Sequence, residues 1–323
     1  MERRTFIGAL AAGTVASVAG VIKAQQANVR RVGLLTAGTL PKTIPAAWRD
    51  ELRDRGWVEG QNLVTERRSA DGHSDRVPAL AAELVQMNLD VIVSFGAVAG
   101  VAIKNATTTI PIVATTGDPV RLGLVSNLSH PGGNITGVSS IAPELAAKRL
   151  ELIREFLPKA TLVGELVDPA NTYWQRVRLD YEQAFRTQRM RPLFVEVADP
   201  GEIEKAIAQI AGQRADALVV RADPIFTSNR EQIGRLAVQY ALPTMAEDQR
   251  FVEAGMLMSY GPNQSAVERI IVSYIDRILR GAKAGDLPIA QPTKFDFAIN
   301  GRTAKALGLT IPQSLLLRGA EVI

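Results

Sequence analysis

The residues best suited to chemistry in this chain are hydroxyl, glycine and acidic residues that follow short apolar runs. The first half of the chain offers Thr36, Gly38, Ser94, Gly96, Thr116 and Asp118. The second half offers Asp168, Asn171, Trp174, Asp223, Glu247 and Tyr260. Acidic groups can accept hydrogen bonds from an ammonium or hydroxyl group, and aromatic rings can stack on a flat ligand. The set therefore predicts a site that binds a small organic ligand.

The same residue types also have purely structural uses. Ser, Thr and Asp cap helices, and Asp before Pro starts turns, so capping is the simpler interpretation at any single position. Tyr173 and Trp174 could pack a helix onto its own sheet, whereas Trp48 is a further candidate for stacking on a ligand. Arg221 is a candidate partner for a carboxylate. Taken together, the set favours a ligand cleft.

The chain lacks the residue patterns of common catalytic, metal and cofactor sites. It has no cysteine and two histidines, His73 and His130, both in polar stretches beside Gly72 or Pro131. Neither histidine belongs to an HExxH pattern, and no GxxxxGK[ST] phosphate loop occurs. The glycine-rich stretch 96–102 lacks the third glycine of a dinucleotide fingerprint. We expect no catalytic residue, no metal, no cofactor and no enzymatic activity.

Short apolar runs alternate with amphipathic helical stretches along the chain. Strands are expected at 30–36, 63–69, 90–95, 111–116, 135–140, 161–168, 193–198, 217–222, 243–247 and 255–260. Helices are expected between them, for example at 46–57 and 143–157, and a long helix within 259–279. This alternation predicts an α/β fold of two doubly wound parallel-sheet lobes. Ligands of such sheets bind at the carboxyl ends of the strands, where the candidate residues lie.

The connections between the two halves predict a multi-strand hinge. If the long helix packs back onto the first lobe, the chain crosses between lobes more than once, unlike a simple tandem of domains. The compact connections near Gly137 and Gly261 favour this arrangement. We predict lobe 1 at 30–138 plus 263–287 and lobe 2 at 139–262 plus 288–323. The lobes would rock about the strands near Ser139 and Tyr260.

The first 26 residues predict export. Arg3 and Arg4 precede a short Gly/Ala-rich apolar run, and small residues at 24–27 suit a signal peptidase. This pattern is typical of a twin-arginine signal peptide, although a buried N-terminal helix is the alternative. No second apolar run is long enough to span a membrane, and no cysteine could carry a lipid. We therefore expect a periplasmic, soluble mature chain without stable membrane insertion, and a monomer.

Composition excludes a nucleic-acid partner. The 323 residues carry a formal net charge of +4 and are 46% hydrophobic, which is typical of a soluble globular protein of two lobes. The signal segment carries a net +2, from Glu2, Arg3, Arg4 and Lys23, so +2 remains on the rest. That charge is too small and too scattered to form a nucleic-acid surface.

Three segments of the chain resemble a known family. They are residues 53–72, 110–140 and 294–323, with the D-P-V-x-x-G-L-V and P-G-G-N-x-T-G patterns in the second and N-x-x-T-A-K-A-L-G-L-x-I-P-x-S-L-L-L-R in the third. These patterns resemble the ABC-transporter substrate-binding proteins that include the tryptophan- and tyrosine-type periplasmic receptors. The resemblance covers essentially the whole mature chain. It implies the type I periplasmic-binding-protein fold.

The resemblance also implies partners and site residues. The partners would be a small-molecule ligand, an ABC permease and its cytoplasmic ATPase. The family's cleft positions correspond to Thr36, Gly38, Ser94, Gly96, Thr116, Asp118, Asp168, Asp223 and Glu247. The chain departs from the family pattern at 37–45, at 168–174 and at Arg221, all on the expected ligand surface. An amino acid and an aromatic compound are the two candidate classes of ligand.

Two alternatives belong to other functional classes. A ligand-sensing domain for a signalling partner would bind and close in the same way as a transport receptor. An exported α/β hydrolase could use a carboxylate such as Asp118 or Glu247. The missing nucleophile elbow and the absence of clustered histidines disfavour the hydrolase.

Overall fold

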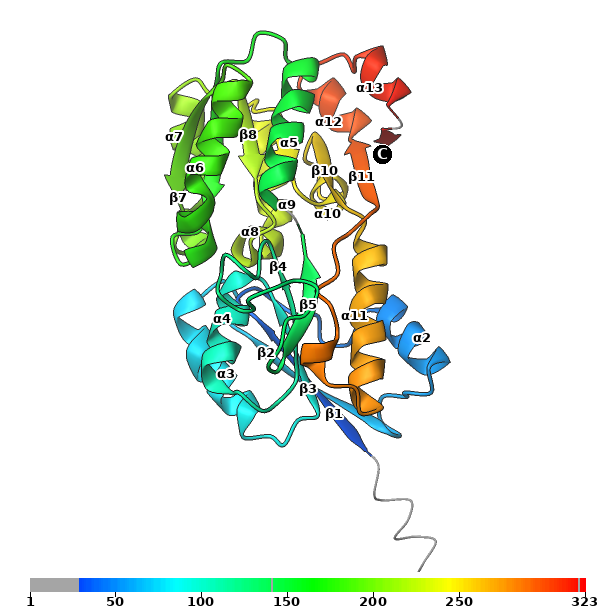
Figure 1. The fold of residues 1–323 in the computed structure, drawn as a ribbon. Coiled ribbons are helices and arrows are strands. Elements are labelled where there is room, and N and C mark those ends of the chain that lie inside the picture. Colours follow the sequence, from blue (N-terminus) through cyan, green and yellow to red (C-terminus); the bar gives the residue numbers. More distant parts are fainter. Residues whose placement is uncertain (1–28, 141, 319) are drawn as a thin grey trace, which may run out of the picture.

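The chain forms two α/β lobes that lie end to end in the computed structural model (Figure 1). The structure describes residues 29–140, 142–318 and 320–323. The predicted signal peptide, residues 1–26, lies outside the described residues. Over the described ranges, no helix has the length and apolar character needed to cross a membrane.

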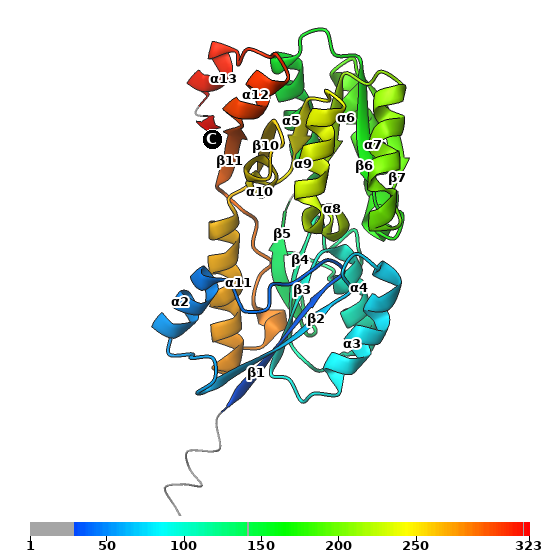
Figure 2. The ribbon, with the colours of Figure 1, turned by 180° about the vertical axis from the view of Figure 1, so that it is seen from behind.

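Lobe 1 is built on a five-stranded parallel sheet with the order β2-β1-β3-β4-β5. Its strands are β1 (Arg30–Thr36), β2 (Leu63–Ser69), β3 (Val91–Phe95), β4 (Ile112–Thr116) and β5 (Ile135–Ser139). Helices α2 (Ala46–Asp54) and α11 (Gln264–Leu279) cover one face, and α3 (Val77–Val85) and α4 (Ala97–Ala106) cover the other (Figures 1 and 2). Strands β1, β3, β4 and β5 are mostly buried and contain many Val, Ile and Leu residues, whereas the edge strand β2 is more polar and half-buried.

Lobe 2 is built on a seven-stranded sheet with the order β12-β11-β10-β9-β8-β6-β7. Its strands are β6 (Leu162–Val167), β7 (Arg191–Glu196), β8 (Ala217–Val220), β9 (Thr244–Ala246), β10 (Met258–Pro262), β11 (Phe295–Ile299) and β12 (Glu321–Val322). Helices α5 (Ala142–Phe156) and α6 (Thr172–Thr187) pack on one face, and α7 (Ile203–Gly212) and α9 (Arg230–Gln239) pack on the other. Only the β10–β11 pair is antiparallel among the described strands.

Shorter helices complete both lobes. They are α8 (Pro224–Ser228), α10 (Gln249–Glu253), α12 (Gly301–Ala306) and α13 (Gln313–Leu317), with the 3-10 turns η1 (Ser74–Arg76), η2 (Pro200–Glu202) and η3 (Ala284–Asp286). The loops after β8 and β9 lead directly into α8 and α10. Both short helices therefore start at the carboxyl end of the lobe 2 sheet.

The predicted fold class is confirmed, and the strand bounds differ mainly at the last run. The predicted strand at 255–260 is wrong over residues 255–257, because Gly255 has a φ of 103° and ends α10. Strand β10 instead begins at Met258 and continues to Pro262. The alternation FDFAI at 295–299 forms β11, which was not predicted as a strand.

The chain crosses between the lobes at three places. It crosses from β5 to α5, from β10 to α11, and from η3 to β11. The last crossing runs alongside β5, where Ser139 N donates to Ala290 O at 2.9 Å and Ala290 N donates to Gly137 O at 2.9 Å. Helix α11 packs on α2 and β5 of lobe 1, although the strand before it belongs to lobe 2. The lobes are thus joined by a multi-strand hinge.

The two sheets share one topology, which positions the site. In lobe 1 the order is β2-β1-β3-β4-β5, and in lobe 2 the equivalent strands are β7-β6-β8-β9-β10. In each sheet the order reverses beside the first strand, between β1 and β3 and between β6 and β8. A crevice forms at such a switch point because the loops leave the sheet on opposite faces.

The hinge strand β5 depends on a glycine, which gives a stability prediction. Gly137 has a φ of 148°, and a Cβ atom there would lie 1.8 Å from the carbonyl oxygen of Ala114 on β4. We expect Gly137→Ala to lower the free energy of unfolding by about 2 kcal/mol, because the backbone has to move. Urea denaturation would measure this. Gly212→Ala at the end of α7, where a Cβ meets nothing within 4 Å, is the matched control; an equal loss in both variants would contradict the explanation.

Candidate ligand-binding site

A cavity of about 360 Å³ lies between the lobes, at the carboxyl ends of both sheets. This volume is within the range of roughly 300 to 1,000 Å³ that is common for small-molecule sites. Lobe 1 contributes residues that follow β1, β3 and β4, and lobe 2 contributes residues that follow β6, β8 and β9. The two switch points therefore face each other across one enclosed space.

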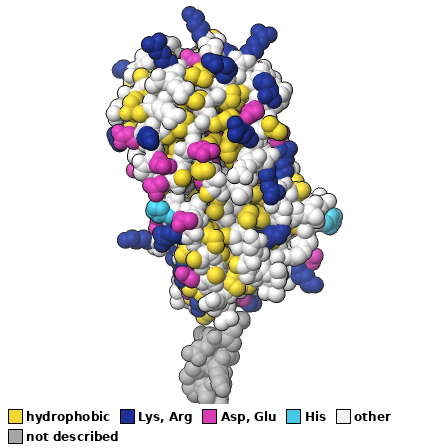
Figure 3. Space-filling view, turned by 90° about the vertical axis from the view of Figure 1, so that its left-hand side faces the viewer, with side chains coloured by type: hydrophobic (Ala, Val, Ile, Leu, Met, Phe, Trp, Pro, Cys, Tyr) yellow, Lys and Arg dark blue, Asp and Glu magenta, His cyan; other side chains and the backbone are white. Residues whose placement is uncertain are grey.

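Direct contacts join the two lobes beside the cavity. The backbone N–H of Thr39 in lobe 1 donates to Ser228 Oγ in lobe 2 at 2.9 Å. Arg121 of lobe 1 forms an ion pair with Asp180 on α6. Figure 3 shows the face that lies to the left in Figure 1, where acidic and basic side chains are scattered over the surface of both lobes. The structure is a closed arrangement of the two lobes.

Glycines in lobe 1 make this close approach possible. A Cβ atom at Gly117 would lie 2.4 Å from a ring carbon of Tyr173, which begins α6 of lobe 2. A Cβ atom at Gly38 would lie 2.8 Å from the carbonyl oxygen of Pro224, and one at Gly96 would lie 3.1 Å from the Pro224 ring. These glycines leave room for the opposite lobe.

A buried ion pair forms the floor of the cavity in lobe 2. Arg149 on α5 donates from Nη1 to Glu247 Oε1 at 2.7 Å and from Nε to the Tyr260 carbonyl at 2.8 Å. The backbone N–H of Ala222 donates to the other oxygen of Glu247 at 3.0 Å. Burial alone would raise the pKa of Glu247, but the guanidinium groups of Arg149 and Arg221 outweigh it and lower the pKa. Glu247 is therefore ionised, and both of its carboxylate oxygens accept hydrogen bonds from the protein.

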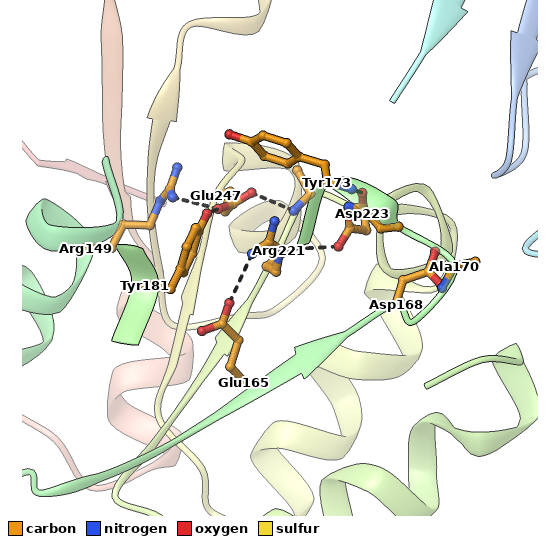
Figure 4. Close-up of polar contacts among 11 residues, drawn as sticks. Arg149, Glu165, Asp168, Ala170, Tyr173, Tyr181, Arg221, Asp223 and Glu247 are labelled. Atoms are coloured by element: carbon orange, nitrogen blue, oxygen red, sulfur yellow. Dashed lines mark hydrogen bonds and ion pairs between the residues drawn. The ribbon is translucent and has the colours of Figure 1, made fainter. Parts of the chain in front are cut away.

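Arg221 lies beside this pair, near Tyr181, Glu165 and Asp223 (Figure 4). Its guanidinium carbon is 4.9 Å from the Trp174 ring centre and 4.6 Å from that of Tyr181. Its Nη1 is 3.5 Å from Glu165 Oε1, and its Nε is 3.3 Å from Asp223 Oδ2. The carboxylate partners of Arg221 are thus the protein's own.

Glu165 is a fully buried carboxyl group in the middle of β6. Burial raises the pKa of Glu165 to about 7, the Arg221 charge opposes this rise, and the Glu247 charge adds to it. The folded protein therefore holds a proton on this group at pH values where the unfolded chain has lost it.

This shift predicts a pH-dependent difference between the protein and a Glu165→Gln variant. A carboxyl group whose pKa is raised in the folded state stabilises the protein at pH values below its ordinary pKa of 4.5. This stabilisation is lost as the pH rises toward about 7. The variant's free energy of unfolding, relative to the unaltered protein, should rise by about 2 kcal/mol between pH 5 and pH 7.5. Denaturant titrations across that range would measure the difference. A difference that stays constant with pH would contradict the assignment.

Asp223 presents a carboxylate to the cavity. Its Oδ1 accepts from Asn171 Nδ2 at 2.6 Å, and the Asn171 side-chain oxygen caps α6 by accepting from Tyr173 N. Its Oδ2 is buried and has no hydrogen-bond partner in the described part of the chain. Burial raises the pKa of Asp223, and Arg221 opposes that rise. Arg221 Nε lies 3.3 Å from Oδ2, and a ligand cation there would add the hydrogen bond that this oxygen lacks.

Lobe 1 supplies an apolar wall opposite these charges. Trp48 on α2 and Phe95 at the end of β3 line the cavity, with ring centres 5.9 Å apart. Val267 and Ile271 of α11 complete this wall. The cavity therefore has an apolar wall in lobe 1 and a charged wall in lobe 2, and Arg67 and Glu268 of lobe 1 also reach its lining.

Seven of the predicted site residues line the cavity: Thr36, Gly38, Gly96, Thr116, Asn171, Asp223 and Glu247. Thr116 Oγ1 is buried and has no hydrogen-bond partner among the described residues, so it is available to a ligand. The other five predicted residues are not in the cavity lining: Ser94, Asp118, Asp168, Trp174 and Tyr260.

Those five residues have structural surroundings that explain their position. Ser94 is enclosed within β3, and Asp118 caps a turn by accepting from the N–H groups of Val120 and Arg121. Asp168 accepts from Ala170 N at 2.8 Å. Burial raises the pKa of Asp168 to about 6, with the Asp223 charge as the second cause.

The two aromatic residues predicted to contact the ligand, Trp174 and Tyr260, pack against other side chains instead. Trp174 packs on Arg221 and meets the Phe194 ring at 4.8 Å between centres. Tyr260 stacks on Phe295, with 6.1 Å between ring centres. Both side chains therefore take part in packing within lobe 2.

Sequence reasoning missed Arg149 and Glu165. Glu165 is an acidic residue within the apolar run LVGELV, and a charge inside a buried strand is a recognisable sign of a buried pair. Arg149 had no such sign, because charged residues are common along α5. The described residues hold no group of three or more His, Asp or Glu side chains that could bind a metal ion.

Two lobes of equal strand order around a shared cavity form the type I periplasmic-binding-protein fold. The family model described as ABC transporter substrate binding protein matches residues 43–323. The chain belongs to this family, whose members are solute-binding proteins. The family predicted from the sequence is thereby confirmed.

Individual relatives span most of the chain. The tyrosine-binding protein of Clostridioides difficile is 26% identical over 260 residues, which are 80% of this chain and 74% of that protein. The structure of a conserved domain protein from Vibrio cholerae has a TM-score of 0.84 at 26% identity and covers 92% of this chain and 100% of its own. An ABC domain from Streptococcus pneumoniae in complex with L-Trp has a TM-score of 0.79 at 25% identity, with coverage of 90% and 100%.

Proposed function

We propose that the protein is an exported receptor that captures an amino acid with an apolar or aromatic side chain and delivers it to an ABC importer. The observation that carries this proposal is the two-sided cavity, with Asp223 on its charged wall and Trp48 and Phe95 on its apolar wall. A zwitterion attached to an apolar group matches both walls. Two relatives are named for L-Trp or tyrosine, which is consistent with such a ligand.

Each part of such a ligand has a candidate partner among the residues that line the cavity. The ammonium group would bind Asp223 Oδ2, where a charge-assisted hydrogen bond is strong. The carboxylate would lie at Thr116 and at the start of α4, whose Gly96 cap supplies no side-chain hydrogen bond to the first amides. The side chain would pack against Trp48 and Phe95, whose rings contact each other.

Capture would proceed by closing the lobes about the hinge. Shifting the protein from mostly open to mostly closed requires about 5.5 kcal/mol of differential affinity. Charge-assisted hydrogen bonds contribute roughly 1.5 to 3 kcal/mol each, and a buried ring adds a similar amount. The contacts named above suffice when they form only in the closed state.

Export and delivery complete the proposal. The twin-arginine pattern in residues 1–26 would direct the chain to the periplasm, where the closed monomer would dock on an ABC permease driven by its ATPase. Family membership supports a transport role. Deletion of a neighbouring permease gene should abolish ligand uptake without changing ligand binding to the purified receptor.

A ligand panel tests the binding part of the proposal. The panel contains L-tryptophan, L-tyrosine, L-phenylalanine and L-leucine, their deaminated and decarboxylated analogues, and sugars. We expect a raised melting temperature only with compounds that carry both an ammonium and a carboxylate, confirmed by calorimetric titration. Binding of sugars, or of deaminated acids as tightly as of the amino acids, would contradict the proposed class.

Replacement of Trp48 tests the apolar wall. We expect Trp48→Ala to weaken the binding of the preferred amino acid about 10- to 30-fold, because a buried ring contact is lost. Calorimetric titration would measure the change. Trp57→Ala is the matched control, because Trp57 donates to Asp276 at 2.8 Å and does not line the cavity. Equal losses in the two variants would show that the effect comes from packing in lobe 1.

A further inference from the structure

The aromatic residues of lobe 2 surround a cation that belongs to the protein. Trp174 and Tyr181 lie about two turns apart on α6. Their ring centres are 4.9 and 4.6 Å from the guanidinium carbon of Arg221. The two rings are 5.6 Å apart and nearly perpendicular. All three side chains are buried. Arg221, which also lines the cavity, thus fills an aromatic recess within the charged wall.

Arg221 also holds the carboxylate that faces the ligand. Its Nε lies 3.3 Å from Asp223 Oδ2, while Asn171 binds Oδ1, so the carboxylate is held from both sides. On its other side the guanidinium faces Glu165, whose oxygens have no hydrogen-bond partner among the described residues. One buried cation therefore lies between two buried carboxyl groups.

We propose that Arg221 is a positioning residue that fixes Asp223 for the ligand's ammonium group, and that Trp174 and Tyr181 form a recess reserved for this guanidinium. The role toward the ligand rests on the proposed function, whereas the recess does not. Two consequences follow. The ligand's ring is excluded from Trp174 and Tyr181 and packs instead against the lobe 1 wall. Removal of the Arg221 side chain leaves a recess of two rings and two carboxyl groups, which suits a small planar cation.

The first experiment tests the recess with guanidinium chloride as the probe. In Arg221→Ala, 10 mM guanidinium chloride should raise the melting temperature by about 2 °C relative to 10 mM sodium chloride, because the ion binds the folded state. The unaltered protein should show no such rise. Arg178→Ala is the matched control, since Arg178 lies 5.5 Å from the Phe194 ring but is 57% exposed. No rise in Arg221→Ala, or an equal rise in Arg178→Ala, would overturn the recess.

The second experiment tests positioning with L-tryptophan and its deaminated analogue, 3-(indol-3-yl)propanoate. Arg221→Ala should bind L-tryptophan about 10- to 100-fold more weakly and the analogue less than about threefold more weakly, because only the ammonium uses Asp223. Guanidinium chloride at 10 mM should recover most of the lost affinity. An equal loss for both compounds would indicate a structural role and overturn the positioning role.

A conservative variant keeps the test decisive if Arg221→Ala does not fold. Arg221→Lys retains the charge that Glu165 and Asp223 need, but lacks the planar donors that hold the Asp223 carboxylate. Its preference for L-tryptophan over the analogue should fall at least about fivefold. An unchanged preference would overturn the proposal. If the unaltered protein binds no amino acid at all, the proposed function fails, while the guanidinium experiment on the recess still stands.

Discussion

Asp223→Asn should weaken the binding of the preferred amino acid about 100- to 1,000-fold. Asp223 lines the cavity, and its Oδ2 has no hydrogen-bond partner in the described chain, although Arg221 Nε lies 3.3 Å away. Asn171 holds the other oxygen, Oδ1. The variant would remove the negative charge from a buried ammonium pair, a change that costs about 3 to 4 kcal/mol in comparable sites. Calorimetric titration at neutral pH would measure this loss.

Asp118→Asn is the matched control for this prediction. Both aspartates follow strands and are expected in the site from the sequence, but Asp118 binds backbone N–H groups of its own turn and does not line the cavity. We expect less than about a threefold change in affinity for this variant. Comparable losses at both positions would contradict the assignment of the ammonium to Asp223. The melting temperature of each variant shows whether it is folded.

Gly117→Ala should prevent full closure and weaken ligand binding about 100-fold. The added methyl group would lie 2.4 Å from the Tyr173 ring, which is itself buried. Relief of this clash requires either the ring or the opposite lobe to move, at a cost of about 1 to 3 kcal/mol. X-ray scattering with saturating ligand should therefore show less compaction than for the unaltered protein.

The double variant Gly117→Ala/Tyr173→Ala separates closure from local damage. Removing the ring removes the clash, so compaction on ligand addition should return, although the loss of Tyr173 from the cavity wall lowers the affinity. If the double variant stays as open as Gly117→Ala alone, the alanine acts within lobe 1. The contact between Gly117 and Tyr173 would then have no part in closure.

The strand pattern was predictable because each strand is a short apolar run. Strands β1 and β2 have the predicted bounds, and both sheets place polar strand ends at one crevice. This rule predicted Thr36, Thr116, Asp223 and Glu247, because residues just after parallel strands lie at the carboxyl edge of the sheet, where the crevice forms. The rule is weaker where a polar group has a local partner. Asp118 illustrates this, because its own turn satisfies its carboxylate.

The remaining site features depend on contacts that are distant in the sequence. The partner of Glu247 is Arg149, which is 98 positions away and lies on a helix with several charged residues. The Trp174 ring looked suited to a ligand, but Arg221 takes that place, 47 positions further along the chain. Gly38 was predicted as a ligand-binding residue, and Gly117 lies between the predicted Thr116 and Asp118. Their contacts with Pro224 and Tyr173 exist only when the lobes meet.

The buried charges explain why the charged wall keeps its shape. Arg149 and Arg221 compensate Glu247 and Asp223, and Glu165 is the further carboxyl group beside them. Removing one partner of such a pair leaves an uncompensated buried charge, which is strongly destabilising. The wall is thus organised before the ligand arrives, and little ordering remains to be done on binding.

A crystal structure grown with the tightest-binding compound of the panel tests the central claim most directly. The account predicts one ligand molecule in the cavity between closed lobes, its ammonium nitrogen within hydrogen-bond distance of Asp223 and its side chain against Trp48 and Phe95. A ligand bound outside this cavity, or lobes that stay apart around an empty cavity at saturating concentration, would contradict it.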